Sequence, residues 1–211
     1  MMNMSHLSAW LNTVMTDGHN GGACFWVMPV KIEADRLGNN WNNHIWEHKS
    51  EEISIDEEAV EYFLQYFLRK HYNRKLSVKY KKLADLECYN EEFEWNLEHN
   101  VYTYDGVREM LCEIRESANL LEKDFHDLSL DKVKEIFPHW LNDIAWASFC
   151  DYRKNDENGE RAEWGQGKSW ESFWEDADIA AVVDFYRRFC SRMEKMMECS
   201  PGFCDISFMG P

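Results

Sequence analysis

The chain has 211 residues, of which 45% are hydrophobic and 15% aromatic. It can therefore bury a sizeable core and is too apolar to be disordered, so we expect a single globular domain over residues 1–211. Asp and Glu (39) outnumber Lys and Arg (23), which gives a net charge of -16. Because that field repels nucleic acid and anionic lipid at long range, the composition disfavours binding to either.

The cysteines indicate a reducing compartment. Their number is odd, they form no C-x-x-C pair, and no secretory leader precedes Ser5. No apolar run reaches the roughly 18 residues of a membrane-spanning helix. We therefore expect reduced thiols in a cytoplasmic protein, with Cys112 and Cys190 filling the apolar faces of helices. The seven cysteines are Cys24, Cys88, Cys112, Cys150, Cys190, Cys199 and Cys204.

The first predicted elements are a short helix and a strand. Ser5 can cap a helix whose apolar face extends to Met15, and Gly18 ends it. Residues 23–33 are rich in β-forming side chains, but Pro29 lacks the N–H that a regular central ladder needs. This segment therefore predicts an edge or bulged strand.

Residues 38–50 contain four asparagines and follow neither the helical nor the strand period, which predicts a loop. Ser54 with Glu57 three residues later forms a capping-box pattern, and the helical spacing that follows predicts a helix to about His71. Apolar and polar residues alternate over residues 93–97, and residues 101–104 are β-branched or aromatic. Together residues 93–104 therefore predict a hairpin.

The second half of the chain is predicted to be mainly helical. An amphipathic helix runs from Asp105 to about Lys123, capped by Thr103 or Asp105, and another begins after Ser129. Pro138 breaks or kinks that helix. On its far side, residues 140–149 resume as a helix.

Residues 153–168 have no apolar stripe and three glycines, and we expect a mobile loop there. Residues 176–198 predict the longest helix, and residues 203–208 a short strand. Together the elements predict an α+β fold that is mostly helical, with about five helices packed on a small, largely antiparallel sheet.

The sharpest local motif is His44-Ile-Trp-Glu47-His48, which has the spacing H-x-x-E-H. These five residues resemble the inverted zincin motif, in which two histidines bind zinc and the Glu activates water. On a helix the two imidazoles would share a face. The resemblance implies a metal-dependent hydrolase with His44 and His48 as zinc ligands and Glu47 as the catalytic residue.

Such a site needs a third protein ligand, for which position suggests Glu91, Glu92 or Glu94. The surroundings favour another interpretation, because four asparagines precede the motif where a zincin has a robust helix. The histidines are then solvent-exposed or hydrogen-bonded, and no cofactor is expected.

Cys24 follows His19-Asn-Gly-Gly, and a thiolate beside a glycine loop can act as a nucleophile with a histidine as its base. Cys24 also begins an apolar strand, which favours a buried, inert thiol.

Charge is arranged in blocks. Residues 51–61 hold six acids and no base, 69–82 hold seven bases and no acid, and 85–98 hold six acids. The basic segment 69–82 can bind nucleic acid, with Tyr72 and Tyr80 stacking on bases. The favoured interpretation is that these bases complement the dipole at the end of a helix and pair with the flanking acids.

Tryptophans in the two predicted loops are candidate binding anchors, because Trp is enriched at interfaces. They are Trp41 and Trp46 in the asparagine-rich loop, and Trp164, Trp170 and Trp174 around the mobile one. With the -16 charge they favour a non-catalytic protein, such as an acidic inhibitor or immunity protein, that binds a basic protein partner. A metal-dependent hydrolase and a nucleic-acid-binding protein are the alternatives.

Overall fold

The structure is a computed structural model that describes residues 6–18, 22–32, 45–48, 51–72, 99–136 and 176–210. The helical elements are α1 (His6–Leu11), α2 (Glu57–Ala59), the π-helical turn η3 (Val60–Leu64), α3 (Gln65–His71), α6 (Tyr104–Asp124), the 3-10 turn η4 (Phe125–Asp127), α7 (Leu130–Ile136) and α9 (Asp176–Glu198). The strands are β1 (Met15–Asp17), β2 (Cys24–Ile32), β3 (Ile45–His48), β4 (Ile53–Asp56), β5 (His99–Thr103) and β6 (Asp205–Met209).

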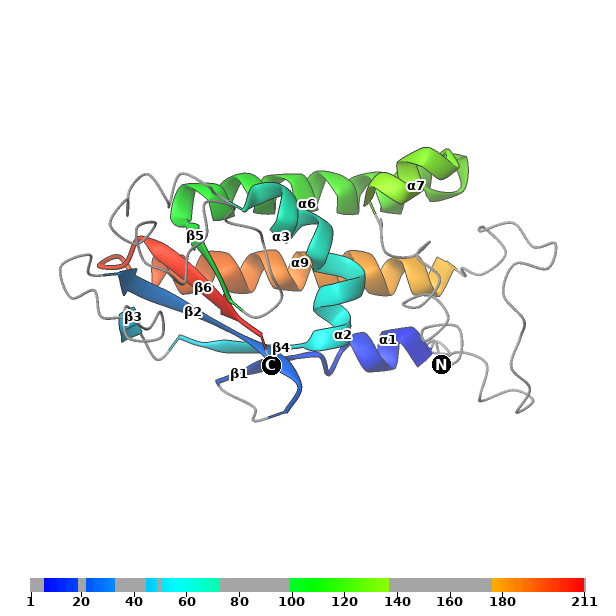
Figure 1. Cartoon of the computed structure of the whole chain (residues 1–211). Coiled ribbons are helices and arrows are strands. Elements are labelled where there is room, and N and C mark those ends of the chain that lie inside the picture. The colour runs from blue at the N-terminus through cyan, green and yellow to red at the C-terminus, as the bar shows by residue number, and fades with distance from the viewer. Residues whose placement is uncertain are drawn as a thin grey trace.

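The described strands form one six-stranded antiparallel sheet in the order β1-β4-β2-β6-β5, and β3 pairs with β2 (Figure 1). Helices α6 and α9 run side by side in opposite directions. Phe25 and Val27 of β2 alternate onto the same face as Ile206 and Phe208 of β6, and all four join the helices in one buried cluster. The mostly helical α+β prediction is confirmed.

The prediction for residues 23–33 was an edge or a bulged strand. Strand β2 lies between β4 and β6, so it is not an edge strand, but its pairing with β3 has the register shift of a bulge. Strand β6 pairs with residues 26–30 on one side. On the other side, β4 pairs up to Val27 and β3 from Val30, with a register shift after Lys31. Pro29 lies in the interval between β4 and β3, where its missing N–H breaks no ladder bond on that side.

The first helix is shorter than predicted. Helix α1 ends at Leu11, because the N–H and the hydroxyl of Thr13 both donate to the Trp10 carbonyl, each at 2.8 Å. Met15 instead begins β1 and pairs with β4. Gly18, with a φ of 74°, therefore turns the chain after a strand and not after a helix.

The helix predicted after Ser54 is present, but its cap is different. Ser54 lies on β4, and its hydroxyl donates to the Gly18 carbonyl at 2.7 Å. Because β4 extends through Asp56, that residue caps the helix, and its carboxylate accepts from the N–H of Ala59 at 3.3 Å. The capping-box prediction is therefore wrong.

Two buried tyrosine hydroxyls hold this helix against the rest of the core. Tyr186 of α9 donates to the Phe63 carbonyl, inside the π-helical turn, at 2.9 Å. Tyr102 of β5 donates to the Leu68 carbonyl, also at 2.9 Å. The helix is thus tied to both α9 and the sheet.

The long helices match their predictions. Helix α6 is capped by Thr103, whose hydroxyl accepts from the Gly106 N–H at 3.1 Å, and α7 follows Ser129 as expected. Cys190 of α9 is buried, as predicted for a thiol that fills a helix face. Cys112 is exposed, because the apolar stripe of α6 passes through the neighbouring Leu111 and leaves Cys112 on the outer side.

One sequence segment differs from the prediction, and the predicted hairpin is described only in part. Residues 45–48, within the predicted loop, form β3 because they find backbone partners on β2. In the predicted hairpin, β5 pairs with β6, and residues 93–97 lie outside the described residues. Pro138 and the segments 140–149 and 153–168 also lie outside them. None of the described helices combines the length and apolarity needed to cross a membrane.

Candidate functional site

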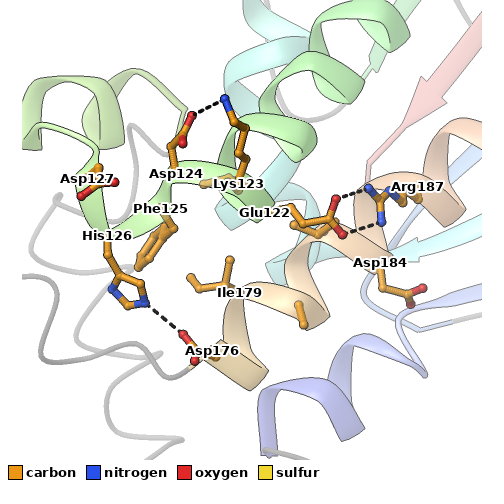
Figure 2. Close-up of a pocket in the computed structure, with 13 residues that line it drawn as sticks. Glu122, Lys123, Asp124, Phe125, His126, Asp127, Asp176, Ile179, Asp184 and Arg187 are labelled. Atoms are coloured by element: carbon orange, nitrogen blue, oxygen red, sulfur yellow. Dashed lines mark hydrogen bonds and ion pairs between the residues drawn. The ribbon is translucent and has the colours of Figure 1, made fainter.

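A cavity of about 610 Å³ lies between the end of α6, the turn η4 and the start of α9 (Figure 2). We call it the interhelical cavity. Its lining residues are Leu121, Glu122, Lys123, Asp124, Phe125, His126, Asp127, Asp176, Ile179, Ala180, Val183, Asp184 and Arg187. Because α6 and α9 are antiparallel neighbours, the C-terminal end of one adjoins the N-terminal half of the other.

The floor of the interhelical cavity is apolar. Leu121 and Phe125 come from the α6 side, and Ile179 and Val183 from α9. All four side chains are buried. Figure 2 shows Phe125 and Ile179 between two contacts that connect the α6 side of the cavity to α9, the Glu122–Arg187 ion pair and the His126–Asp176 hydrogen bond.

The ion pair is bidentate. Nη1 and Nη2 of Arg187 donate to the two carboxylate oxygens of Glu122, at 3.0 and 2.6 Å. These hydrogen bonds lower the pKa of Glu122 and raise that of Arg187. Both side chains remain about half exposed to solvent (48% and 56% for Arg187 and Glu122), so the pair contributes little to stability.

A hydrogen bond lies at the other end of the floor, where Nε2 of His126 is 2.9 Å from Oδ1 of Asp176. Lys123 lies 3.7 Å from Asp124, its neighbour in the chain. The lining thus contains five carboxylates against one Lys and one Arg, and both of these cations are paired with carboxylates of the lining. The interhelical cavity is therefore negatively charged.

The position of two of these acids is unfavourable for the helix that carries them. Glu122 and Asp124 lie in the last turn of α6, where the helix dipole favours cations and disfavours carboxylates. Asp176, in the first turn of α9, is favourably placed. Acids at a helix C-terminus were the one signal in the sequence that could have indicated this cavity.

The structure describes four of the five residues of the H-x-x-E-H motif. Trp46, Glu47 and His48 lie on β3, a strand, whereas the zincin arrangement requires a helix. His44 lies outside the described residues. Within the described part of the chain, no three His, Cys, Asp or Glu side chains are grouped so that they could hold a metal ion. The zinc site stays a prediction.

The remaining predicted ligands and binding anchors lie outside the described residues. They are Trp41, Glu91, Glu92, Glu94, Trp164, Trp170 and Trp174. His19, the proposed base for Cys24, also lies outside them. Cys24 itself is half-buried at the start of β2.

The described part of the basic segment is engaged in ion pairing. Nζ of Lys70 and Nε2 of His71 lie 2.5 and 2.6 Å from the two carboxylate oxygens of Glu113 on α6. Burial alone would raise the pKa of Glu113, but the hydrogen bonds from Lys70 and His71 outweigh it and lower the pKa. The acid in these contacts belongs to α6, whereas the predicted partners were the acids of the flanking blocks 51–61 and 85–98. Residues 73–82 lie outside the described residues.

Comparisons of the chain with protein-family models, with curated proteins and with solved structures find no match.

Proposed function

We propose that the chain is a non-catalytic, cytoplasmic protein-binding protein, of the type of an acidic inhibitor or immunity protein, and that a basic partner binds at the interhelical cavity. The observation that carries the proposal is the combination of an apolar floor with a carboxylate-rich rim. Such a surface complements an amphipathic basic segment, whose apolar side chains contact the floor while its Lys and Arg side chains meet the rim.

The placement of the rim acids supports this function. Glu122 and Asp124 stand at the helix end where carboxylates are unfavourable, so the dipole of α6 does not account for them, and Glu122 is held there by its ion pair with Arg187. The net charge of -16 would in addition steer a basic partner toward the protein over longer distances.

The test is capture of partners from a lysate of the source cells by tagged protein in three forms. The site variant carries Asp127→Asn and Asp176→Asn, which remove two rim charges. The control variant carries Asp105→Asn and Glu109→Gln, which remove two exposed charges from the opposite end of α6. We expect a basic protein to be retained by the wild type and the control and lost from the site variant. Equal retention by all three forms would contradict the proposal.

A further inference from the structure

The two ends of the interhelical cavity differ in charge. Figure 2 shows Glu122 and Arg187 at one end, which we call the Arg187 end, and His126, Asp127 and Asp176 at the other, which we call the Asp127 end. We propose that the cavity accepts a single cationic side chain of its partner at the Asp127 end, and that Arg187 closes the other end to a second one. This inference rests on the proposed function and adds the position of the partner's charge.

Guanidinium groups neutralise the carboxylates of the Arg187 end. Both oxygens of Glu122 accept from Arg187, at 3.0 and 2.6 Å. Asp184, the other acid at this end, accepts from Nε of Arg188 at 2.7 Å. A cation of the partner could reach Glu122 only by displacing Arg187, which exchanges one exposed ion pair for another and gains little free energy. The Arg187 end therefore offers no net attraction to a second cation.

The Asp127 end keeps negative charge that no neighbouring cation cancels. Asp124 has Lys123 at 3.7 Å. Asp127 is exposed and makes no hydrogen bond or ion pair with any residue that the structure describes. Asp176 lies 2.9 Å from the imidazole of His126, and a neutral imidazole can donate to a carboxylate without cancelling its charge. Asp127 and Asp176 are thus the acids of the lining that a partner's cation can neutralise.

The apolar floor lies between the two ends and makes the cavity directional. Phe125 and Ile179 occupy its middle in Figure 2. A segment whose Lys or Arg lies at one end of an apolar stripe can place the cation beside Asp127 while its apolar side chains cover the floor. A second cation at the far end of the stripe would meet Arg187 and gain nothing.

Two helical peptides of equal length and equal net charge test this asymmetry. Each has the same Leu stripe and two Lys residues. The one-ended peptide has one Lys at an end of the stripe and the other on the opposite face of the helix, whereas the two-ended peptide has a Lys at each end of the stripe. Affinity for the full-length protein is measured by fluorescence anisotropy at about 50 mM salt. We expect the wild type to bind both with affinities within about twofold.

Arg187→Gln should convert the cavity into a site for two cations, because it frees the carboxylate of Glu122. We expect the two-ended peptide to bind this variant about fivefold more tightly than the wild type, and the one-ended peptide to change by less than about twofold. Arg108→Gln is the matched control. It removes the same charge from an exposed ion pair, with Asp105 at 2.7 Å, at the opposite end of α6, and it should leave both affinities within about twofold of the wild type.

Asp127→Asn locates the cation and should weaken binding of both peptides by about fivefold. An unchanged affinity of Asp127→Asn would overturn the inference. So would a wild type that already prefers the two-ended peptide by about fivefold, or equal responses to Arg187→Gln and Arg108→Gln. Each of these results would leave the proposed function standing, because the peptides still bind. Binding of neither peptide to the wild type would instead contradict the proposed function and this inference with it.

Discussion

The buried hydroxyl of Tyr186 is the single polar atom with the clearest structural role. Burial raises its pKa well above the usual value, so it stays protonated and donates to the Phe63 carbonyl at 2.9 Å. Tyr186→Phe leaves that carbonyl without this partner and should lower the free energy of unfolding by about 1–3 kcal/mol. Urea unfolding measures the change. Tyr66→Phe, at an exposed hydroxyl, is the control and should cost less than about 0.5 kcal/mol.

Glu113 predicts a pH dependence of stability. Its pKa is lower in the folded protein than the ordinary value of 4.5, so the unfolded chain takes up the proton first as the pH falls. Stability from Glu113 is therefore present above about pH 4.5 and is lost as the pH falls through the folded pKa.

Urea unfolding of the wild type and Glu113→Gln at about pH 7 and about pH 4 tests this linkage. The difference in stability between the two proteins should shrink at the lower pH. Glu109→Gln, at an exposed residue, should show no such change. A difference that is the same at both pH values would refute the role of Glu113.

Among the elements, α6 depends on its N-cap. Thr103 accepts from the Gly106 N–H, so Thr103→Ala should lower the free energy of unfolding by about 1 kcal/mol, whereas Thr103→Ser should preserve most of it. Thermal and urea unfolding of both variants measure this. Equal losses for Ala and Ser would show that the methyl group, and not the hydroxyl, stabilises this end of the helix.

Elements that are determined by residues close together in the sequence could be predicted, and elements that depend on distant residues could not. Helices α6 and α9 follow from apolar residues at helical spacing, and Thr103 from the preference of Thr for the N-cap. The residues misassigned between helix, strand and loop include Ser54, Met15 and the segment 45–48. Each is placed by strand pairing with a distant part of the chain, which no window of the sequence displays.

At the scale of the whole molecule, the placement of charged residues along the chain says more about candidate binding surfaces than the net charge does. The interhelical cavity could not be predicted, because its ends come from residues far apart, such as His126 and Asp176, which are separated by 50 positions. The acids in the last turn of α6 carried the only local sign of it. The basic segment is described only over residues 69–72, where Lys70 and His71 contact Glu113 of α6 and not an acid of the flanking blocks, so its pairing with those blocks stays a prediction.

The central claim is that the interhelical cavity binds a basic, amphipathic segment through its carboxylates. The most direct measurement is fluorescence anisotropy of a labelled Lys- and Leu-rich helical peptide at about 50 and about 200 mM salt. We predict binding to the wild type that weakens with salt, and at low salt at least about tenfold weaker binding to Asp127→Asn/Asp176→Asn. Asp105→Asn/Glu109→Gln should bind like the wild type. Equal affinity of the site and control variants, or binding that does not respond to salt, would contradict the claim.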